Sequence, residues 1–208
     1  MPLYKTITPN SQTTVKVWKI TESYEDLMAK VNLKSIALER VLGMKSELHQ
    51  RGFLSVRHLL HEFGYTDSDL FYDENGKPHL KDGKQISITH SFNFSAVIVS
   101  DLVVGIDIEK QRDKIAVIAK KFVDYEFQYL LKDDADYIRR LTVIWGIKES
   151  LYKLFATPGL SFKEHCLVIP FSDGSAETTA WIDYNSMKSR FNVQSLEFEG
   201  FTCAYAVV

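Results

Sequence analysis

The stretch from Leu102 to Glu109 constrains the fold most, because it combines a core strand with closely spaced acids. An apolar run enters this stretch, and apolar and acidic residues then alternate. Alternate residues of a strand share a face, so Asp107 and Glu109 should point one way while the intervening isoleucines face the core. Unpaired charge on a core strand is costly. We therefore expect these carboxylates to share a cation; the alternative is a solvated strand end.

A second acidic position lies on a predicted helix over residues 136–156. Trp145, Glu149 and Lys153 are spaced four apart there, with Lys148 and Tyr152 on neighbouring rows. One face of the helix therefore carries a carboxylate flanked by ammonium groups. Glu149 and Lys153 also have the favourable order for an ordinary surface ion pair, which is the alternative interpretation. Together with the acidic strand, Glu149 completes three oxygen ligands, a set that suits Mg²⁺ and leaves room for a phosphate.

Length and charge limit the possible classes of protein. A chain of 208 residues forms one large domain or two small ones, and a net charge of −2 gives no broad electrostatic case for nucleic acid. The N-terminus lacks a signal-peptide pattern, and no apolar run approaches the ~20 residues of a membrane span. Cys166 and Cys203 lie in apolar segments without metal-ligand spacing. We expect a cytoplasmic protein without a membrane or nucleic-acid partner.

The order of elements predicts an α+β fold of two similar halves. Strands are expected at 15–20, 85–91, 94–99, 102–109, 166–171, 176–184, 191–198 and 201–208, and helices near 24, over 33–63 with a break at Gly43, and over 115–122, 124–131 and 136–156. The closing strand resembles the strand at 94–99. We therefore expect an N-terminal half, 1–104, and a C-terminal half, 105–208. The acidic strand and the long helix should line the seam between them.

Three polar segments of the N-terminal half are candidates for binding phosphate. The helix after Gly43 carries Arg51 and Arg57. The turn Asn75-Gly76-Lys77-Pro78 brings backbone N–H groups and a lysine to the surface. His90 ends a strand between hydroxyl side chains, as a phosphate donor would. The alternatives are a solvated basic helix face, an ordinary turn and a structural histidine.

The order of these motifs resembles the 4′-phosphopantetheinyl transferase superfamily. The matching segments are Gly76-Lys77-Pro78, Ile88-Thr89-His90-Ser91, Gly105-Ile106-Asp107-Ile108-Glu109 and Trp145…Lys148-Glu149-Ser150…Lys153. The length and two-half layout look like the monomeric, surfactin-synthetase-activating type. The resemblance covers residues from about 40 to 160. It implies a fold of two α+β halves related by pseudo-twofold symmetry, with the active site at their seam.

The resemblance also implies an activity. These transferases, of which the holo-[acyl-carrier-protein] synthases are one type, move the phosphopantetheine arm of coenzyme A onto a serine of an apo carrier protein. They release 3′,5′-ADP and use Mg²⁺. The carriers serve fatty-acid, polyketide or nonribosomal-peptide biosynthesis. By position, the implied metal ligands are Asp107, Glu109 and Glu149; the implied catalytic residues are Glu126, Glu149 and Lys153; the implied coenzyme-binding residues are Arg51, Arg57, Lys77, Pro78, Thr89, His90, Lys148 and Lys153.

Three positions depart from the family pattern. Thr89 stands where serine is common, but a hydroxyl remains. Gly146 lies inside the signature helix, where glycine costs ~1 kcal/mol relative to alanine. Glu126 matches the family's general base with loose spacing, so proton abstraction by Glu149 or by a water on the metal stays open. A different Mg²⁺-dependent phosphoryl-transfer enzyme and a binding module without turnover are the alternative functions.

Overall fold

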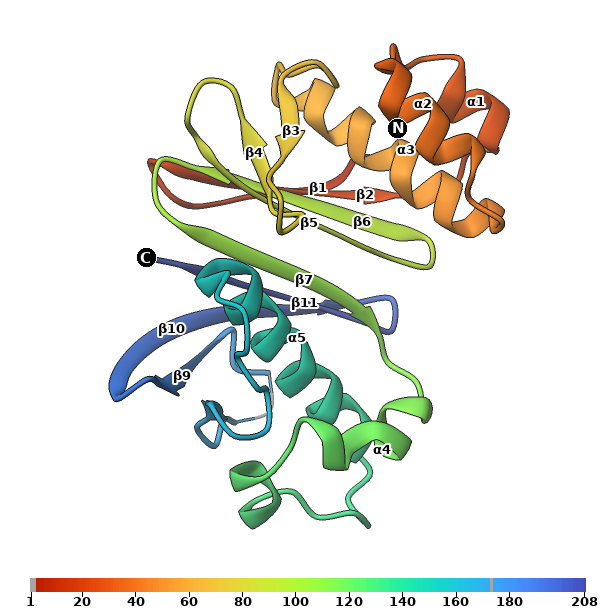
Figure 1. The fold of residues 1–208 in the computed structure, drawn as a ribbon. Coiled ribbons are helices and arrows are strands. Elements are labelled where there is room, and N and C mark those ends of the chain that lie inside the picture. Colours follow the sequence, from red (N-terminus) through yellow and green to blue (C-terminus); the bar gives the residue numbers. More distant parts are fainter. Residues whose placement is uncertain (1–2, 173) are drawn as a thin grey trace. The chain divides into compact units, whose positions relative to one another are not determined.

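The computed structural model describes residues 3–172 and 174–208 (Figure 1). The chain divides into two compact units, Met1–Val103 and Val104–Val208. Each unit combines an antiparallel sheet with helices, so the α+β fold class predicted from the sequence is confirmed. No helix among the described residues is both long and apolar enough to cross a bilayer.

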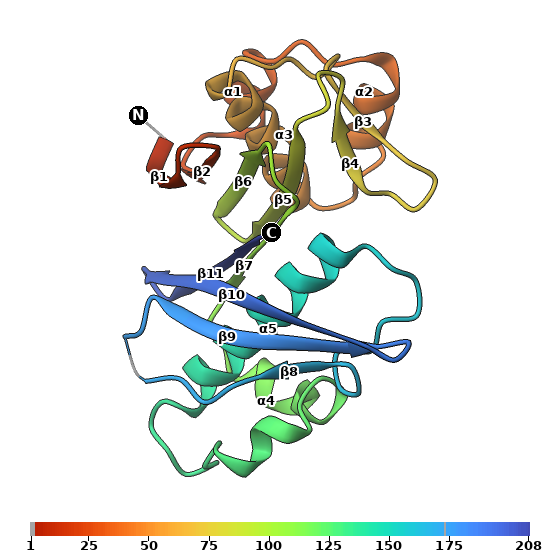
Figure 2. The ribbon, with the colours of Figure 1, turned by 90° about the vertical axis from the view of Figure 1, so that its left-hand side faces the viewer.

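The N-terminal unit is built on a four-stranded antiparallel sheet in the order β1-β2-β6-β5. Its strands are β1 (Leu3–Asn10), β2 (Thr13–Lys19), β5 (Gln85–Ser91) and β6 (Phe94–Ser100); its helices are α1 (Tyr24–Met28), α2 (Ser35–Leu42) and α3 (Glu47–Glu62); β3 (Leu70–Tyr72) and β4 (Pro78–Leu80) form a separate hairpin. Helix α3 packs on β6, β5 and β2, as Figure 2 shows. Its buried leucines meet Val97 and Ile86 in the core of the unit.

The C-terminal unit is built on a five-stranded antiparallel sheet in the order β7-β11-β10-β9-β8. Its elements are β7 (Val104–Lys110), α4 (Lys114–Ile118), the 3₁₀ turns η1 (Ala119–Lys121) and η2 (Tyr125–Gln128), α5 (Tyr137–Phe155), β8 (Cys166–Val168), β9 (Glu177–Tyr184), β10 (Met187–Phe198) and β11 (Phe201–Val207). Helix α5 lies across β7 and β11 (Figure 1). Its apolar side, including Leu141, Ile144 and Ile147, forms the core with residues of the sheet.

A close approach between α5 and β7 positions the acidic residues. Gly105 on β7 lies directly under the α5 backbone, where a Cβ atom would overlap the carbonyl oxygen of Ser150 and lie 2.9 Å from the amide nitrogen of Leu154. Only glycine permits this contact. Since alternate residues of a strand share a face, the face of Gly105 that meets α5 also carries Asp107 and Glu109.

Some predicted elements differ from the structure. The helix expected over 124–131 is only the 3₁₀ turn η2, and the one expected over 115–122 divides into α4 and η1. In η2 the side chain of Glu126 accepts hydrogen bonds from the backbone N–H groups of Asp124 and Val168, so contacts outside a regular helix hold this segment. Strand β1 was not predicted, because its sequence is polar and most of its residues are exposed. The pseudo-twofold symmetry stays a prediction.

Candidate functional site

The centre of the candidate site is an ion pair between β7 and α5. Asp107 is only 5% exposed, and its Oδ1 atom accepts a hydrogen bond from the Nζ atom of Lys153 at 2.7 Å. The same ammonium donates to the carbonyl oxygen of Ile106 at 3.0 Å. Two residues that lie 46 positions apart in the chain therefore meet at one point.

Glu149 adds a carboxyl group whose charge is disfavoured at this point. Burial, reinforced by the negative charge of Asp107, raises the pKa of Glu149 from 4.5 to about 7, although Lys153 acts in the opposite direction. Glu109 contributes a further, smaller increase to the same pKa. Asp107 and Glu109 are thus close enough to Glu149 to disfavour its charge, and a cation would relieve that effect.

The donor chemistry fits a hard divalent cation. Mg²⁺ is held in proteins by one or two carboxylates together with waters and substrate phosphates, and Asp107, Glu109 and Glu149 offer oxygen atoms only. Among the described residues, however, no three His, Cys, Asp or Glu side chains are already spaced around a common point. The ammonium of Lys153 lies against Asp107. A metal ion bound by all three carboxylates would require these side chains to rearrange.

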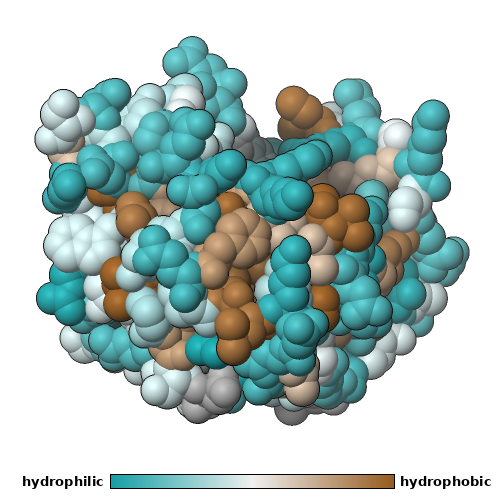
Figure 3. Space-filling model, turned by 90° about the horizontal axis from the view of Figure 1, so that it is seen from below, coloured by the Kyte–Doolittle hydropathy of each residue, from teal (hydrophilic) through white to brown (hydrophobic). Residues whose placement is uncertain are grey.

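A small cavity of about 130 Å³ adjoins Glu109 on the same unit. Its other lining residues are Lys110, Arg112, Lys114, Ile115, Ile118, Thr142 and Trp145. Basic and apolar side chains therefore meet beside the acidic cluster. Seen from the side of α4, the surface has apolar atoms at its centre and hydrophilic ones around them (Figure 3). This combination suits a ligand that is partly apolar and partly anionic.

Lys148 and Glu126, two further predicted site residues, lie inside the C-terminal unit. Both side chains are 0% exposed, and Lys148 Nζ lies 2.8 Å from Glu126 Oε1. Burial lowers the pKa of Lys148, and Glu126 opposes this effect. Lys148 and Glu126 therefore contact each other in the interior, and neither side chain reaches the surface.

His90 is the most accessible of the predicted phosphate-binding residues on β5 and packs against α3. A Cβ atom at Gly52 would lie 2.9 Å from the Nδ1 atom of His90, so the helix needs glycine there to admit the ring. The ring of His49, one turn earlier on α3, lies 6.3 Å from that of His90. The guanidinium of the neighbouring Arg51 donates to the carbonyl oxygen of Ile20 at 3.4 Å.

Comparison with known protein families decides the identity of the chain. A family model described as the 4′-phosphopantetheinyl transferase superfamily matches residues 103–206, which include β7, α5 and the whole acidic cluster. The chain belongs to this superfamily. No curated protein matches it in sequence.

Membership of the superfamily makes the protein a phosphopantetheinyl transferase in general terms, and it confirms the family predicted from the sequence motifs. The match begins only at the last residue of the N-terminal unit, so the coenzyme-binding residues predicted in that unit rest on the sequence motifs and stay predictions. Those residues differ in their surroundings.

Arg57 is buried in this transferase. It is 6% exposed, its Nε atom donates to Asp67 Oδ1 at 3.0 Å, and its guanidinium lies 3.5 Å from the centre of the Phe53 ring. Asp67 also accepts a hydrogen bond from the backbone N–H of Lys34. These contacts favour a structural role for Arg57 in joining α3 to the loop before β3.

Thr89 and the Gly-Lys-Pro segment have surroundings that differ from those of His90. Thr89 is 6% exposed and lies on the face of β5 opposite to the exposed His90. Lys77 ends the β3–β4 turn and Pro78 begins β4; the backbone N–H of Lys77 donates to Asp73 Oδ1 at 2.9 Å. The turn is therefore held by its own aspartate, and its lysine is partly exposed.

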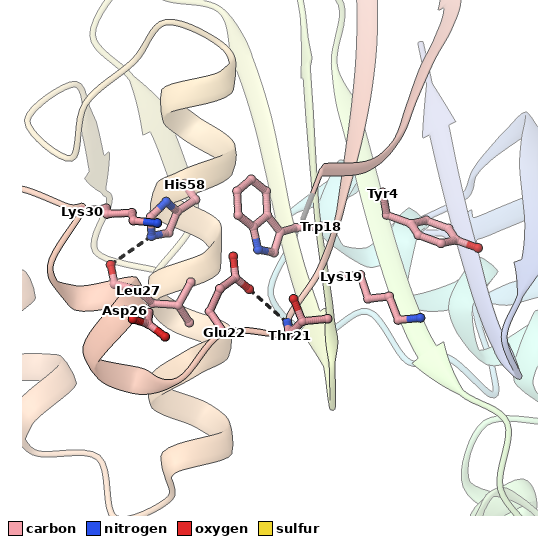
Figure 4. Close-up of a pocket in the computed structure, with 9 residues that line it drawn as sticks. All are labelled: Tyr4, Trp18, Lys19, Thr21, Glu22, Asp26, Leu27, Lys30 and His58. Carbon is pink, nitrogen blue, oxygen red and sulfur yellow. Dashed lines mark hydrogen bonds between the residues drawn. The ribbon is translucent and has the colours of Figure 1, made fainter. Parts of the chain in front are cut away.

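A larger cavity of about 490 Å³ in the transferase's N-terminal unit contains none of the predicted site residues. Trp18 and His58 stack at 5.3 Å in its wall, and acidic and basic side chains of β2, α1 and the segments beside them surround it (Figure 4). His58 is held by a 2.9 Å hydrogen bond with the carbonyl oxygen of Leu27.

Two glycines that shape this transferase were not singled out from the sequence. Gly52 admits the ring of His90, and Gly105 admits α5. Glycine inside a predicted helix was the available signal at position 52, because it costs helix stability unless close packing requires it. At Gly105, the glycine opens a strand, where it also indicates a close approach of another backbone.

We expect Gly52→Ala to weaken coenzyme A binding. The added methyl group must displace the imidazole of His90, since the two would otherwise be in contact at 2.9 Å. His90 is predicted to bind a phosphate of coenzyme A, and loss of that predicted hydrogen bond should raise the KM for coenzyme A roughly tenfold and leave kcat nearly unchanged. Steady-state kinetics at saturating carrier protein measure this effect.

The exposed histidine of the same helix provides the control for this substitution. His61→Ala removes an imidazole from α3 without touching His90, and its KM for coenzyme A should equal that of the wild type. A Gly52→Ala variant that folds normally and keeps the wild-type KM would show that the position of His90 does not matter for coenzyme binding.

Proposed function

We propose that this protein is a monomeric transferase of the surfactin-synthetase-activating type. It moves the phosphopantetheine arm of coenzyme A to a serine of an apo carrier protein with the help of Mg²⁺ and releases 3′,5′-ADP. The observation that carries the proposal is the convergence of Asp107, Glu149 and Lys153 within the segment that matches the superfamily. Two buried free thiols, Cys166 and Cys203, are consistent with a cytoplasmic location.

Asp107, Glu109 and Glu149 would hold the metal ion. When bound, Mg²⁺ supplies positive charge that stabilises the negative charge growing on the diphosphate. Burial and, after it, the negative charge of Asp107 raise the pKa of Glu149, so its charged form is disfavoured without such an ion. The cost of this buried charge supports the proposed ligands and the need for a cation.

Lys153 is the residue best placed to act on the transferred phosphate. Its side chain is 27% exposed, and its ammonium uses two N–H groups on Ile106 and Asp107, which leaves a third donor of the three that a lysine has. A lysine N–H directed at a diphosphate oxygen stabilises the leaving 3′,5′-ADP more strongly as charge develops on it. The chemical step needs no covalent enzyme intermediate, since the carrier's serine hydroxyl attacks phosphorus directly.

Arg51, His90, Lys77 and Pro78 are proposed to contact coenzyme A on the N-terminal unit. His90 and Arg51 lie on neighbouring elements, β5 and α3, and Gly52 lets those elements approach. Imidazole and guanidinium groups are suited to phosphate. Lys77 and Pro78 lie at the end of a turn whose backbone conformation, with φ of +80° at Gly76, is fixed by glycine.

Incubation with coenzyme A, Mg²⁺ and a panel of apo carrier proteins tests the proposal. The panel contains one fatty-acid, one polyketide and one nonribosomal-peptide carrier, each with a matched version in which the acceptor serine is alanine. We expect at least one serine carrier to gain the mass of one phosphopantetheine arm, measured by intact mass spectrometry, and no gain in the presence of EDTA.

The alternative functions predict different results. A binding module would retain coenzyme A in equilibrium dialysis and modify no carrier. A different phosphoryl-transfer enzyme would also leave every carrier unmodified and would not be inhibited by them. Modification of the alanine carriers would exclude transfer to the expected serine.

A further inference from the structure

The ammonium of Lys148 has no hydrogen left for a substrate. It donates to the carbonyl oxygen of Phe122 at 2.7 Å and to that of Phe162 at 3.0 Å, and it lies 2.8 Å from Glu126 Oε1. A lysine has three N–H donors, so these three acceptors account for all of them. The side chain is also 0% exposed. Contact between Lys148 and a diphosphate would require this arrangement to break.

The carboxylate of Glu126 is equally occupied. Its Oε1 atom accepts a hydrogen bond from the backbone N–H of Val168 at 2.9 Å in addition to the contact with Lys148, and Oε2 accepts one from the backbone N–H of Asp124 at 3.3 Å. Glu126 is 0% exposed. A general base must come within hydrogen-bond reach of the proton that it removes, and no carrier serine can reach this carboxylate without opening the unit.

The pair joins five parts of the C-terminal unit. Lys148 belongs to α5, Glu126 to η2 and Val168 to β8, and the two carbonyl groups come from the loops that follow η1 and α5. The bond between Lys148 and Glu126 therefore fixes the rotation of α5 about its own axis. Glu149 follows Lys148 directly, and Lys153 lies just over one turn later.

The same two loops hold aromatic rings against the side of α5 that carries the site. The Phe122 and Phe162 rings lie 5.0 and 5.6 Å from the ring of Trp145, both edge to face. The Phe162 ring also lies 5.5 Å from that of Tyr152. Trp145 in turn lines the cavity beside Glu109. The residues whose carbonyl groups bind Lys148 thus also shape the wall of the site.

We propose that Lys148 and Glu126 are positioning residues, which lock α5 so that Glu149 and Lys153 meet Asp107, and that neither touches substrate. This inference rests on the proposed function, since it concerns the geometry of the same site. It assigns the general-base role to a group other than Glu126. The bond acts through the helix: loss of either partner lets α5 rotate or shift and separates Glu149 from Asp107.

Three variants test the proposal. Glu126→Gln keeps the acceptor for Val168 but leaves a buried ammonium without its counter-ion, Lys148→Met does the reverse, and the double variant removes both charges. Removal of one partner from a buried pair is strongly destabilising, whereas removal of both is often tolerated. Each single variant should melt about 10 °C below the wild type, and the double variant should recover most of this loss.

Binding of Mn²⁺, followed by electron paramagnetic resonance in the presence of coenzyme A, separates positioning from the other roles. Residues that orient metal ligands change metal affinity by roughly 10–100-fold when replaced. We expect such a loss in both single variants, a similar fall in kcat/KM, and recovery of both quantities to within about tenfold of the wild type in the double variant. Lys188→Met is the control, because Lys188 forms an exposed pair with Asp183, and it should change none of these quantities.

Two outcomes would overturn the proposal and leave the transferase function intact. If Glu126 is the base, Glu126→Gln and the double variant would both be inactive while binding Mn²⁺ as the wild type does. If the pair only stabilises the fold, melting temperatures would fall without any change in Mn²⁺ affinity. Wild-type protein that binds no Mn²⁺ would instead contradict the metal assignment of the proposed function itself.

Discussion

Replacing Gly105 with alanine should destabilise the protein by about 4 kcal/mol and abolish transfer. The new Cβ atom would overlap the carbonyl oxygen of Ser150 and lie 2.9 Å from the amide nitrogen of Leu154. Both atoms belong to the α5 backbone, so no side-chain rotation relieves the overlap and the helix must move away from β7. Urea unfolding followed by circular dichroism measures the loss, and the carrier assay measures the activity.

Gly146→Ala is the matched control for this prediction. A Cβ atom at Gly146 would lie 3.5 Å from Ala204 Cβ and 3.9 Å from Asp107 Oδ2, which are ordinary contacts. Alanine is favoured over glycine inside a helix by ~1 kcal/mol, so this variant should be as stable as the wild type or more stable. If Gly105→Ala is equally stable, the close approach of α5 to β7 does not exist in solution.

The C-terminal site could be predicted because local pattern and tertiary packing agree there. Alternation along Ile106-Asp107-Ile108-Glu109 indicated which side chains share a face, and helical spacing put Glu149 and Lys153 on one side of α5. The structure brings Asp107 and Lys153 within 2.7 Å. Acidic residues on a core strand predict a nearby cation, since a buried charge is stable only when it is paired.

The roles of Lys148 and Glu126 could not be predicted in the same way. Consecutive residues of a helix point about 100° apart, so Lys148 and Glu149 face different neighbours although they are adjacent in the motif. Which neighbour Lys148 meets depends on η2 and on the loops around it, where sequence reasoning expected a helix over 124–131. No sequence pattern around a lysine shows that its ammonium donates to backbone carbonyl groups of distant loops.

Arg57 shows the same limit in the N-terminal unit. Both Arg51 and Arg57 look like exposed basic residues of α3 in the sequence, yet Arg57 pairs with Asp67 in the interior. The two partners are ten positions apart in the chain, and the sequence between them has no charge pattern from which the pair could be predicted. Residue type and helical position therefore indicate a possible phosphate ligand, but the partner that the side chain meets in the fold determines whether it can bind phosphate.

Glu149→Gln should abolish transfer and at the same time stabilise the metal-free protein. Glutamine keeps the shape of the side chain but cannot supply a charged ligand, so we expect kcat/KM to fall by about 10³-fold. A carboxyl whose pKa rises from 4.5 to about 7 on folding costs stability as the pH rises through this range, because the unfolded chain loses its proton first. The full cost above pH 7 is roughly 3 kcal/mol, which partial solvation reduces to about 1–2 kcal/mol.

The pH dependence of this difference distinguishes it from a simple packing effect. In EDTA, Glu149→Gln and the wild type should unfold at the same urea concentration at pH 4.5, and the variant should become the more stable of the two as the pH rises to 8. Added Mg²⁺ should stabilise the wild type more than the variant, because only the wild type keeps all three charged ligands. A variant that is less stable than the wild type at pH 8 in EDTA would mean that neither burial nor the neighbouring carboxylates disfavour the charge of Glu149, and the case for a shared cation would then fail.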